Sequence, residues 1–306
     1  MNVLITGGAG FIGSHIAEHF NGNANIKILD NLRSGYKHNL EGFDVEFIEG
    51  SITDRKILEQ ACKGVDYVFH LAAMISVPES MEKPEECVEI NATGILNVLR
   101  AAADAGAKKL CFSTSAAIYG DNPVVPKLET MFPEPKSPYA VTKLDGEYYC
   151  NMFTSEGWLD TACLRYFNVF GPRQDPGSQY AAAIPIFVYK ALRNETITVF
   201  GDGEQTRDFI YVKDIAAANV YLATTEHTGV YNVAYGGQIT INQLAKKIIE
   251  YTGSSSKIEY LPSRAGDVKH SRACVDKLMA TGFKPGADFE LGLEKTIDFF
   301  KSKVDG

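Results

Sequence analysis

Several features that mark particular protein classes are missing from this sequence. Its six cysteines, at positions 62, 87, 111, 150, 163 and 274, include no C-x-x-C pair, and no cluster of cysteine and histidine has metal-ligand spacing. We therefore expect no metal site, and thiols that serve as small apolar side chains in a reducing compartment. The net charge of −8 and the lack of a basic run with interleaved aromatic residues argue against a nucleic-acid partner.

Long hydrophobic runs are also missing. No apolar run reaches the length that a membrane-spanning helix needs. The opening residues, MNVLIT, are too few for the apolar core of a signal peptide and lead directly into a glycine turn. We expect a cytoplasmic protein with no membrane partner.

What the sequence does contain is an alternation of short apolar runs with helical patterns. Apolar residues make up 45% of the chain, enough for a sizeable core. Continuous apolar strands separated by helices predict a parallel sheet covered on both faces, the doubly wound α/β (Rossmann) arrangement. The strands are expected at residues 2–6, 26–30, 45–50, 65–73 and 108–115, with helices to about residue 20 and at 54–62, 86–105 and 138–155.

This alternation changes after about residue 170. The stretch GPRQDPGSQ is typical of a polar loop, and ITVFGDGEQTRDFIYVKDIA predicts two short strands around a turn, followed by a helix. YNVAYG, at 231–236, predicts a strand that returns to the first sheet. We therefore expect a cofactor-binding domain at 1–170 with this returning strand, and a smaller, interleaved α/β substrate domain at 171–306.

The first predicted strand leads into TGGAGFIG, which then opens a helix. Gly7, Gly10 and Gly13 would allow a tight turn and the close approach of a pyrophosphate to the helix N-terminus. The second predicted strand ends at Asp30, whose carboxylate can bond both hydroxyls of an adenosine ribose and would repel a 2′-phosphate. The pattern predicts NAD as cofactor, although Arg33 leaves an opening for NADP.

The stretch SPYAVTK, residues 137–143, allows two interpretations. Ser137 and Pro138 suit the start of a helix, and on that helix Tyr139 and Lys143 share a face. Such a pair is common on solvated helices, so the spacing alone does not indicate catalysis.

Taken together, the motifs over essentially the whole chain resemble the extended short-chain dehydrogenase/reductases, and within them the nucleotide-sugar 4-epimerases. They are TGGAGFIG, HLAA (70–73), STS (113–115), SPYAVTK, RYFNVFG (165–171), GDGEQTRDFIYVKD (201–214) and RAGDVKHS (264–271). The resemblance implies that Tyr139 is the acid/base, that Lys143 holds the nicotinamide ribose and lowers the tyrosine pKa, and that Ser115 bonds the reacting hydroxyl. A free phenol, with a pKa of about 10, is a poor base at neutral pH.

The same resemblance implies two sets of binding residues. The NAD set is Gly7, Gly10, Phe11, Ile12, Gly13, Asp30, Asn31, Ser34, Gly35, Ser51, Ile52, Leu71, Ala72, Ala73, Asn91, Ser113, Tyr139, Lys143 and Tyr166. The UDP-sugar set is Ser76, Ser115, Tyr139, Asn168, Val199, Phe200, Arg207, Arg264, Asp267 and Ser271. Ser51 stands where many members carry an aspartate that faces the adenine amine, which puts that contact in doubt. For Asn168 a structural role in a backbone turn is the alternative.

The reaction is predicted from what the site lacks. Dehydratases of this family carry an Asp-Glu pair where this chain has Ala116 and Ala117, and its decarboxylases use an acidic residue there. The remaining chemistry is C4 epimerisation of UDP-hexoses through a 4-keto intermediate. A nucleotide-4-keto-sugar oxidoreductase and a non-enzymatic NAD sensor are the alternatives.

The resemblance also bears on the sugar and on assembly. Ser271 replaces a tyrosine common in epimerases confined to unacetylated hexoses, and with Ser76 it favours UDP-GlcNAc/UDP-GalNAc in addition to UDP-Glc/UDP-Gal. An enzyme restricted to UDP-glucose and UDP-galactose is the alternative, with Ser271 only capping the next segment. The helices at 86–105 and 138–155 carry more apolar surface than one buried face requires, and here the resemblance implies a homodimer with a four-helix interface. Packing of these helices against the sheet and the second domain is the alternative.

Overall fold

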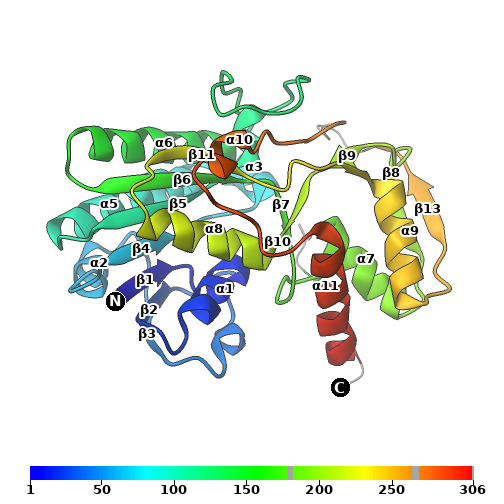
Figure 1. The fold of residues 1–306 in the computed structure, drawn as a ribbon, viewed down its shortest axis with the longest axis horizontal. Coiled ribbons are helices and arrows are strands. Elements are labelled where there is room, and N and C mark those ends of the chain that lie inside the picture. Colours follow the sequence, from blue (N-terminus) through cyan, green and yellow to red (C-terminus); the bar gives the residue numbers. More distant parts are fainter. Residues whose placement is uncertain (178–181, 264–268, 305–306) are drawn as a thin grey trace.

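A computed structural model describes residues 1–177, 182–263 and 269–304. Its centre is a parallel sheet with the strand order β11-β6-β5-β4-β1-β2-β3 (Figure 1). The order reverses at β1, as in a doubly wound fold, and this confirms the predicted fold class. The strands are β1 (Asn2–Thr6), β2 (Asn25–Asp30), β3 (Val45–Glu49), β4 (Tyr67–His70), β5 (Lys109–Ser115), β6 (Asp160–Tyr166) and β11 (Gly229–Val233).

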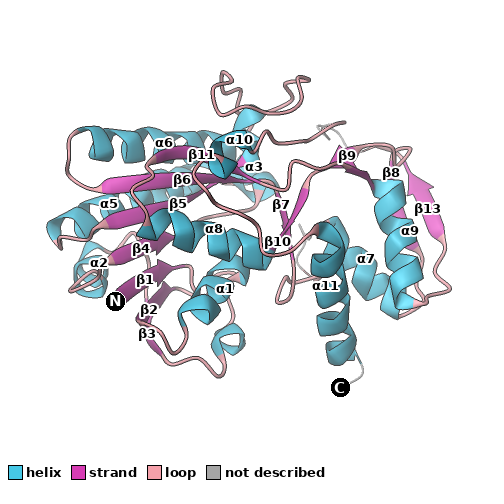
Figure 2. Cartoon of the chain, viewed as in Figure 1, coloured by secondary structure: helices cyan, strands magenta, loops and turns pink. Residues whose placement is uncertain are grey.

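Both faces of the sheet are buried because successive side chains along a strand point to opposite sides. Val3 and Ile5 of β1 pack on one face with the helices α1 and α8, whereas Leu4 packs on the other with α2, α5 and α6. Figure 2 shows these helices in layers around the strands. Their bounds are α1 (Phe11–Phe20), α2 (Arg55–Ala61), α5 (Gly94–Asp104), α6 (Pro138–Ser155) and α8 (Val212–Thr224). In the described part of the chain, no helix is both long enough and apolar enough to cross a membrane.

The connection between β4 and α5 differs from the prediction. The expected continuous helix at 86–105 is divided, and β4 ends at His70, three residues earlier than expected. A wider, π-helical stretch carries Asn91, whose side chain turns back to bond the backbone of Met74 in the loop after β4. The elements here are α3 (Val77–Glu82), α4 (Pro84–Cys87) and η2 (Val88–Thr93), and two short 3-10 helices follow β2 and β5, η1 (Lys37–Leu40) and η3 (Ala116–Tyr119).

A second, smaller layer lies beside the sheet and has its own apolar core of aromatic and aliphatic side chains. The two short strands predicted around a turn exist, but they do not pair with each other, since each has a partner distant in the sequence. β8 (Ile197–Phe200) pairs with β13 (Ile258–Leu261), β10 (Phe209–Tyr211) pairs with β7 (Asn168–Phe170), and β9 (Thr206–Arg207) pairs with β12 (Ile239–Thr240). The helices are α7 (Ala183–Leu192), α9 (Ile241–Thr252), α10 (Asp276–Met279) and α11 (Phe289–Val304).

A buried polar network ties α6 to the strands. Glu147 of α6 accepts two hydrogen bonds from Arg165 of β6, at 2.9 and 2.6 Å, and a third from Thr114 of β5 at 2.8 Å. Arg165 also donates to the hydroxyl of Tyr119, which donates in turn to Asn232 of β11. Every member is nearly inaccessible to solvent, so each depends on its partners for hydrogen bonding.

We predict that Glu147→Gln lowers the free energy of unfolding by about 3 kcal/mol, because it leaves the Arg165 guanidinium buried without a counter-charge. Urea denaturation followed by circular dichroism measures the change. Asp104→Asn is the matched control: Asp104 pairs with Arg100 at 3.1 Å with both side chains mostly exposed, so its loss should cost less than about 1 kcal/mol. Equal effects of the two substitutions would show that the buried pair has no special role.

Candidate active site and cofactor cavity

A cavity of about 680 Å³ opens at the carboxyl ends of the central strands, where parallel sheets of this kind bind ligands. Of the residues predicted to bind NAD, all but Asn91 line it. Asn91 is buried behind the wall, where its side-chain amide bonds both backbone groups of Met74 and the hydroxyl of Thr142. It therefore shapes the wall rather than facing the cavity.

The glycine turn fits a pyrophosphate. Gly7 has φ +72°, and a Cβ there would lie 2.7 Å from the backbone nitrogen of Ala72. A Cβ on Gly13 would lie 2.3 Å from the carbonyl oxygen of Gly7, so only glycine lets the helix start pack on the turn. Gly10 is the N-cap of α1, with no side chain capping the first turn, and the backbone N–H groups of this turn remain a site for an anion.

Asp30 stands at the end of β2, where the sequence predicted it. Its carboxylate accepts hydrogen bonds from the backbone N–H of Ala9 and of Leu32, at 2.9 and 2.8 Å, and burial raises its pKa. Arg33, the residue that left an opening for NADP, is paired with Glu79 and Glu86. Its charge is therefore already compensated by protein groups. Nearby, the Ser51 hydroxyl lies 2.8 Å from that of Thr53.

The three predicted catalytic residues lie on the wall of the same cavity. Ser137 caps α6 through a hydrogen bond from the backbone N–H of Ala140, and Tyr139 and Lys143 follow one turn apart. Ser115 ends β5, beside this helix start. The Lys143 ammonium donates to the carbonyl of Ser113 at 2.7 Å and lies 5.8 Å from the centre of the Tyr139 ring.

Burial governs the protonation of this pair. Burial lowers the pKa of Lys143 to about 8. Burial also raises the pKa of Tyr139, and the hydrogen bond with Ser115 opposes this only in part. Desolvation of the phenolate is thus the largest influence on the Tyr139 pKa in the protein without bound NAD. That Lys143 and the bound nicotinamide lower this pKa stays a prediction.

Of the predicted substrate residues outside the triad, those that the structure describes do not line the cavity, and several of them gather around Asp208. Asn168 donates from its backbone and its side chain to the Asp208 carbonyl, at 3.2 and 2.9 Å. Arg207 is the last residue of β9 and directly precedes Asp208. The backbone N–H of Ser271 donates to the carbonyl of Thr206, also on β9. The structure thus brings together three positions that are far apart in the sequence.

The remaining predicted substrate residues are elsewhere. Val199 and Phe200 lie on β8, in the second layer. Ser76 is the N-cap of α3 and accepts a hydrogen bond from the backbone N–H of Glu79. Arg264 and Asp267 lie outside the described residues.

Asp208 was not anticipated from the sequence. Its carboxylate accepts hydrogen bonds from the backbone N–H groups of Ala273 and Tyr235, which joins the segment after Ser271 to the loop after β11. Burial raises the pKa of Asp208 to about 6, although these hydrogen bonds favour the charged form and lower it. A charged residue within the apolar run RDFIY was the available signal.

Part of the cavity wall was not predicted from the sequence. The loop after β7 contributes Arg173, Gln174 and Asp175, which were interpreted only as part of a polar loop. Arg173 donates to the carbonyl of Asn39, another residue of the wall, at 3.2 Å. Asp175 accepts a hydrogen bond from the hydroxyl of Tyr36 at 3.1 Å. These bonds connect the loop to the segment after β2, a pairing that sequence spacing cannot show.

Residues 3–234 match the family model described as Epimerase: NAD dependent epimerase/dehydratase family. The chain belongs to this family, and NAD is its cofactor. This confirms the resemblance drawn from the sequence. A "Putative UDP-glucose 4-epimerase" of Methanocaldococcus jannaschii is 36% identical, with 98% of each chain covered. A "UDP-N-acetyl-alpha-D-glucosaminuronate decarboxylase" of Bacillus cytotoxicus is 34% identical, with 97% of each covered.

Solved structures of the family superpose closely. A "UDP-N-acetylglucosamine 4-epimerase" from Methanobrevibacter ruminantium M1, in complex with UDP-N-acetylmuramic acid, has a TM-score of 0.95 and 44% identity, covering 99% of this chain and 98% of its own. A UDP-glucose 4-epimerase of Thermotoga maritima with UDP-glucose has a TM-score of 0.94 and 39% identity, covering 99% and 100%. A UDP-glucose 4-epimerase of Thermus thermophilus in complex with NAD has a TM-score of 0.90 and 36% identity, covering 98% and 99%.

Proposed function

We propose that the protein catalyses the C4 epimerisation of UDP-hexoses through a transient 4-keto intermediate. The observation that carries the proposal is that Ser115, Tyr139 and Lys143 share one cavity wall with the glycine turn. The similarity to proteins named UDP-glucose and UDP-N-acetylglucosamine 4-epimerase supports it.

In this reaction the protein groups handle the proton and the positioning. NAD, which the glycine turn and Asp30 would hold, would supply reversible hydride transfer at C4. Tyr139 takes the proton from the sugar 4-hydroxyl and gives it back after the keto sugar has turned over. Ser115 bonds the same oxygen. Lys143, whose pKa burial lowers to about 8, still carries its proton near neutral pH and can hold the nicotinamide ribose through N–H donors.

We further propose a division of labour along the chain. Residues 1–170 and the strand β11 would hold NAD, and most of 171–306 would hold the nucleotide. Asn168, next to Asp208, would bond the diphosphate, with Arg207 as a clamp. Arg264 and Asp267, outside the described residues, would add a second clamp and a ribose contact. The backbone of Val199 and Phe200 would frame the uracil, and Ser76 would lie on the sugar side.

Other reactions of the family are less compatible with this site. Family decarboxylases and dehydratases use an acidic residue after β5, where this chain has Ala116 and Ala117 in η3. A methyl group supplies neither acid nor base, so both reactions lack this catalytic group. A nucleotide-4-keto-sugar oxidoreductase could use the same triad, but it would release its cofactor in each cycle. Turnover without added nicotinamide separates the two.

We predict that Tyr139→Phe lowers kcat at least about a hundredfold, because the phenol oxygen carries the proton, while NAD remains bound. Conversion of UDP-hexose to its C4 epimer, followed by NMR with no added cofactor, measures kcat. Tyr251→Phe, which removes a hydroxyl on α9 outside the cavity, is the control and should leave kcat unchanged. If Tyr139→Phe stays within about tenfold of the wild type, another group is the base.

For the sugar, we propose that Ser271 leaves room for an N-acetyl group. The segment at Ser271 packs against β9, where Thr206 and His270 also form a bridge, so the position is fixed beside Arg207. Ser271 does not cap α10, whose N-cap, Val275, uses no side-chain bond. The similarity to the protein named UDP-N-acetylglucosamine 4-epimerase supports the wider substrate range.

We therefore expect Ser271→Tyr to lower kcat/KM for UDP-GlcNAc and UDP-GalNAc by at least about tenfold, through steric exclusion, and to spare UDP-Glc and UDP-Gal. Ser271→Ala, which stays small, should keep both pairs. Initial rates for the four sugars in the three proteins measure this. If Ser271→Tyr converts UDP-GlcNAc and UDP-GalNAc as well as the wild type does, or if the wild type does not convert them, the size argument is ruled out.

We also propose a cytoplasmic homodimer. All six cysteines are free thiols, as expected in a reducing compartment. One face of α6 is apolar and open to solvent, with Val141, Tyr148 and Met152 exposed by 43%, 58% and 41%. An amphipathic helix face of this kind fits a second copy of the same helix across a two-fold axis.

A light-scattering mass of two chains at micromolar concentration is the expected result for the wild type. Tyr148→Asp should shift the mass toward one chain, because it places a charge in the apolar face. Tyr251→Asp, a similar change on an exposed residue of α9, should not. A wild-type mass of one chain would contradict the proposal.

A further inference from the structure

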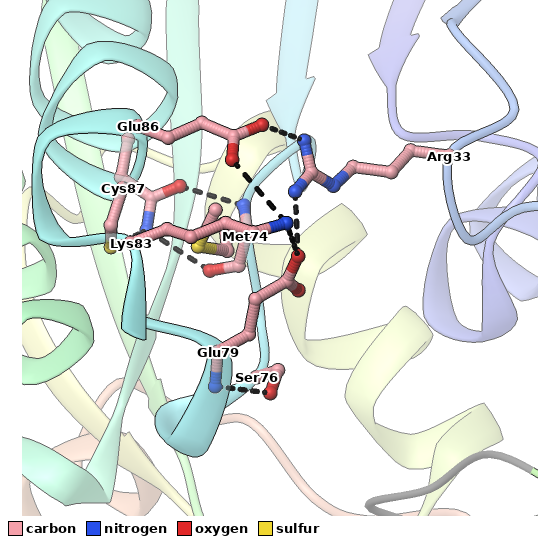
Figure 3. A network of polar contacts seen from close by, with 8 residues as sticks. Arg33, Met74, Ser76, Glu79, Lys83, Glu86 and Cys87 are labelled. Carbon is pink, nitrogen blue, oxygen red and sulfur yellow. Dashed lines mark hydrogen bonds and ion pairs between the residues drawn. The ribbon is translucent and has the colours of Figure 1, made fainter. Parts of the chain in front are cut away.

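An ion-pair network connects Arg33, on the wall of the cofactor cavity, to two glutamates of α3 and α4 (Figure 3). Arg33, in the loop after β2, donates to Glu79 of α3 at 2.8 Å and to Glu86 of α4 at 2.6 Å. The two carboxylates are 46 and 53 residues away in the sequence. The guanidinium therefore joins the loop after β2 to the helices after β4, and β2 and β4 are the two parallel strands that flank β1.

Both joined segments contribute residues to the cavity wall. Arg33 lines the cavity together with Asp30, Asn31 and the loop to Tyr36, and the segment after β4 lines it up to Ile75. Asp30 marks this end of the cavity as the adenosine end, because a carboxylate at the end of the second strand suits the ribose hydroxyls. The network thus borders the end of the cavity where the adenosine half of NAD would lie, with Arg33 as its member on the cavity wall.

Each end of the network is held in place. Ser76 caps α3 by accepting a hydrogen bond from the backbone N–H of Glu79 at 3.0 Å. Lys83 lies 3.5 Å from Glu79 and 3.9 Å from Glu86, which offsets the repulsion between the two carboxylates. In the other segment, the Asn31 side chain accepts a hydrogen bond from the backbone N–H of Arg33.

We propose that Arg33, Glu79 and Glu86 form a clasp that closes over the adenosine end of bound NAD and slows its release. Their side chains are 33%, 28% and 39% exposed, so the clasp can open without unfolding any buried structure. A reaction that regenerates its cofactor in every cycle benefits from such retention. The proposal rests on NAD binding and does not depend on which sugar the enzyme converts.

The test measures cofactor release directly. Purified protein is loaded with NADH, an excess of NAD⁺ is added, and the loss of the bound NADH fluorescence gives the release rate. Arg33→Ala and the double variant Glu79→Gln/Glu86→Gln should each release NADH about tenfold faster, since two partly exposed pairs are lost. The triple variant should be no faster than Arg33→Ala, because all three act as one unit.

Lys37→Ala is the matched control. It removes an ion pair with Glu49 at 2.9 Å, near the same loop, from a residue that does not line the cavity. Its release rate should stay within about twofold of the wild type, as expected for a mostly exposed surface pair.

Two results would overturn the clasp. If Arg33→Ala accelerates release and Glu79→Gln/Glu86→Gln does not, Arg33 acts by touching the cofactor and the carboxylates are incidental. If neither variant releases NADH faster than the control, the network does not retain the cofactor.

Measuring the NADH release rate of the wild type at several salt concentrations tests the clasp without relying on the folding of a variant. Release should accelerate between low salt and about 1 M NaCl, where charges are screened beyond about 3 Å. The part of this acceleration that the clasp causes should be absent from Arg33→Ala. Equal salt dependence in both proteins would contradict the proposal.

Discussion

The buried pair of Glu147 and Arg165 is the interaction on which the active-site geometry depends most. Glu147 lies one turn after Lys143 on α6, so its three hydrogen bonds to β5 and β6 set the rotation and height of that helix against the sheet. A buried ion pair stabilises a protein only when its geometry is good and its remaining donors and acceptors are hydrogen-bonded. Here Thr114 and Tyr119 satisfy them, and the helix is held in one position.

With α6 fixed, the cavity follows from two further constraints. The glycine turn needs residues without a Cβ, because Gly7 and Gly13 approach other backbone atoms more closely than any side chain allows. Desolvation then sets the chemistry. Burial lowers the pKa of Lys143 to about 8 and raises the pKa of Tyr139, since a buried site disfavours the charged form of each group.

Much of the structure was predictable. Six strands of the sheet, the glycine turn, Asp30 and the helix that carries Tyr139 and Lys143 are close to where the sequence places them, because each depends on a periodic pattern or on a few adjacent residues. The strand β6 was not predicted. The division of the helix before α5 and the pairing of β8 with β13 were not predicted. Both arise from contacts between distant segments, which local patterns do not encode.

The sequence by itself determined the order of the elements, the identity of the turn and the spacing of Tyr139 and Lys143, since backbone propensity and side-chain periodicity act over a few residues. Only the tertiary structure decided which residues meet. It brings the Asp208 carboxylate within hydrogen-bonding distance of the backbone N–H of Ala273, 65 positions away, and Arg33 between Glu79 and Glu86. Burial and charge compensation depend on what surrounds a group in space, and only the packed chain supplies those surroundings.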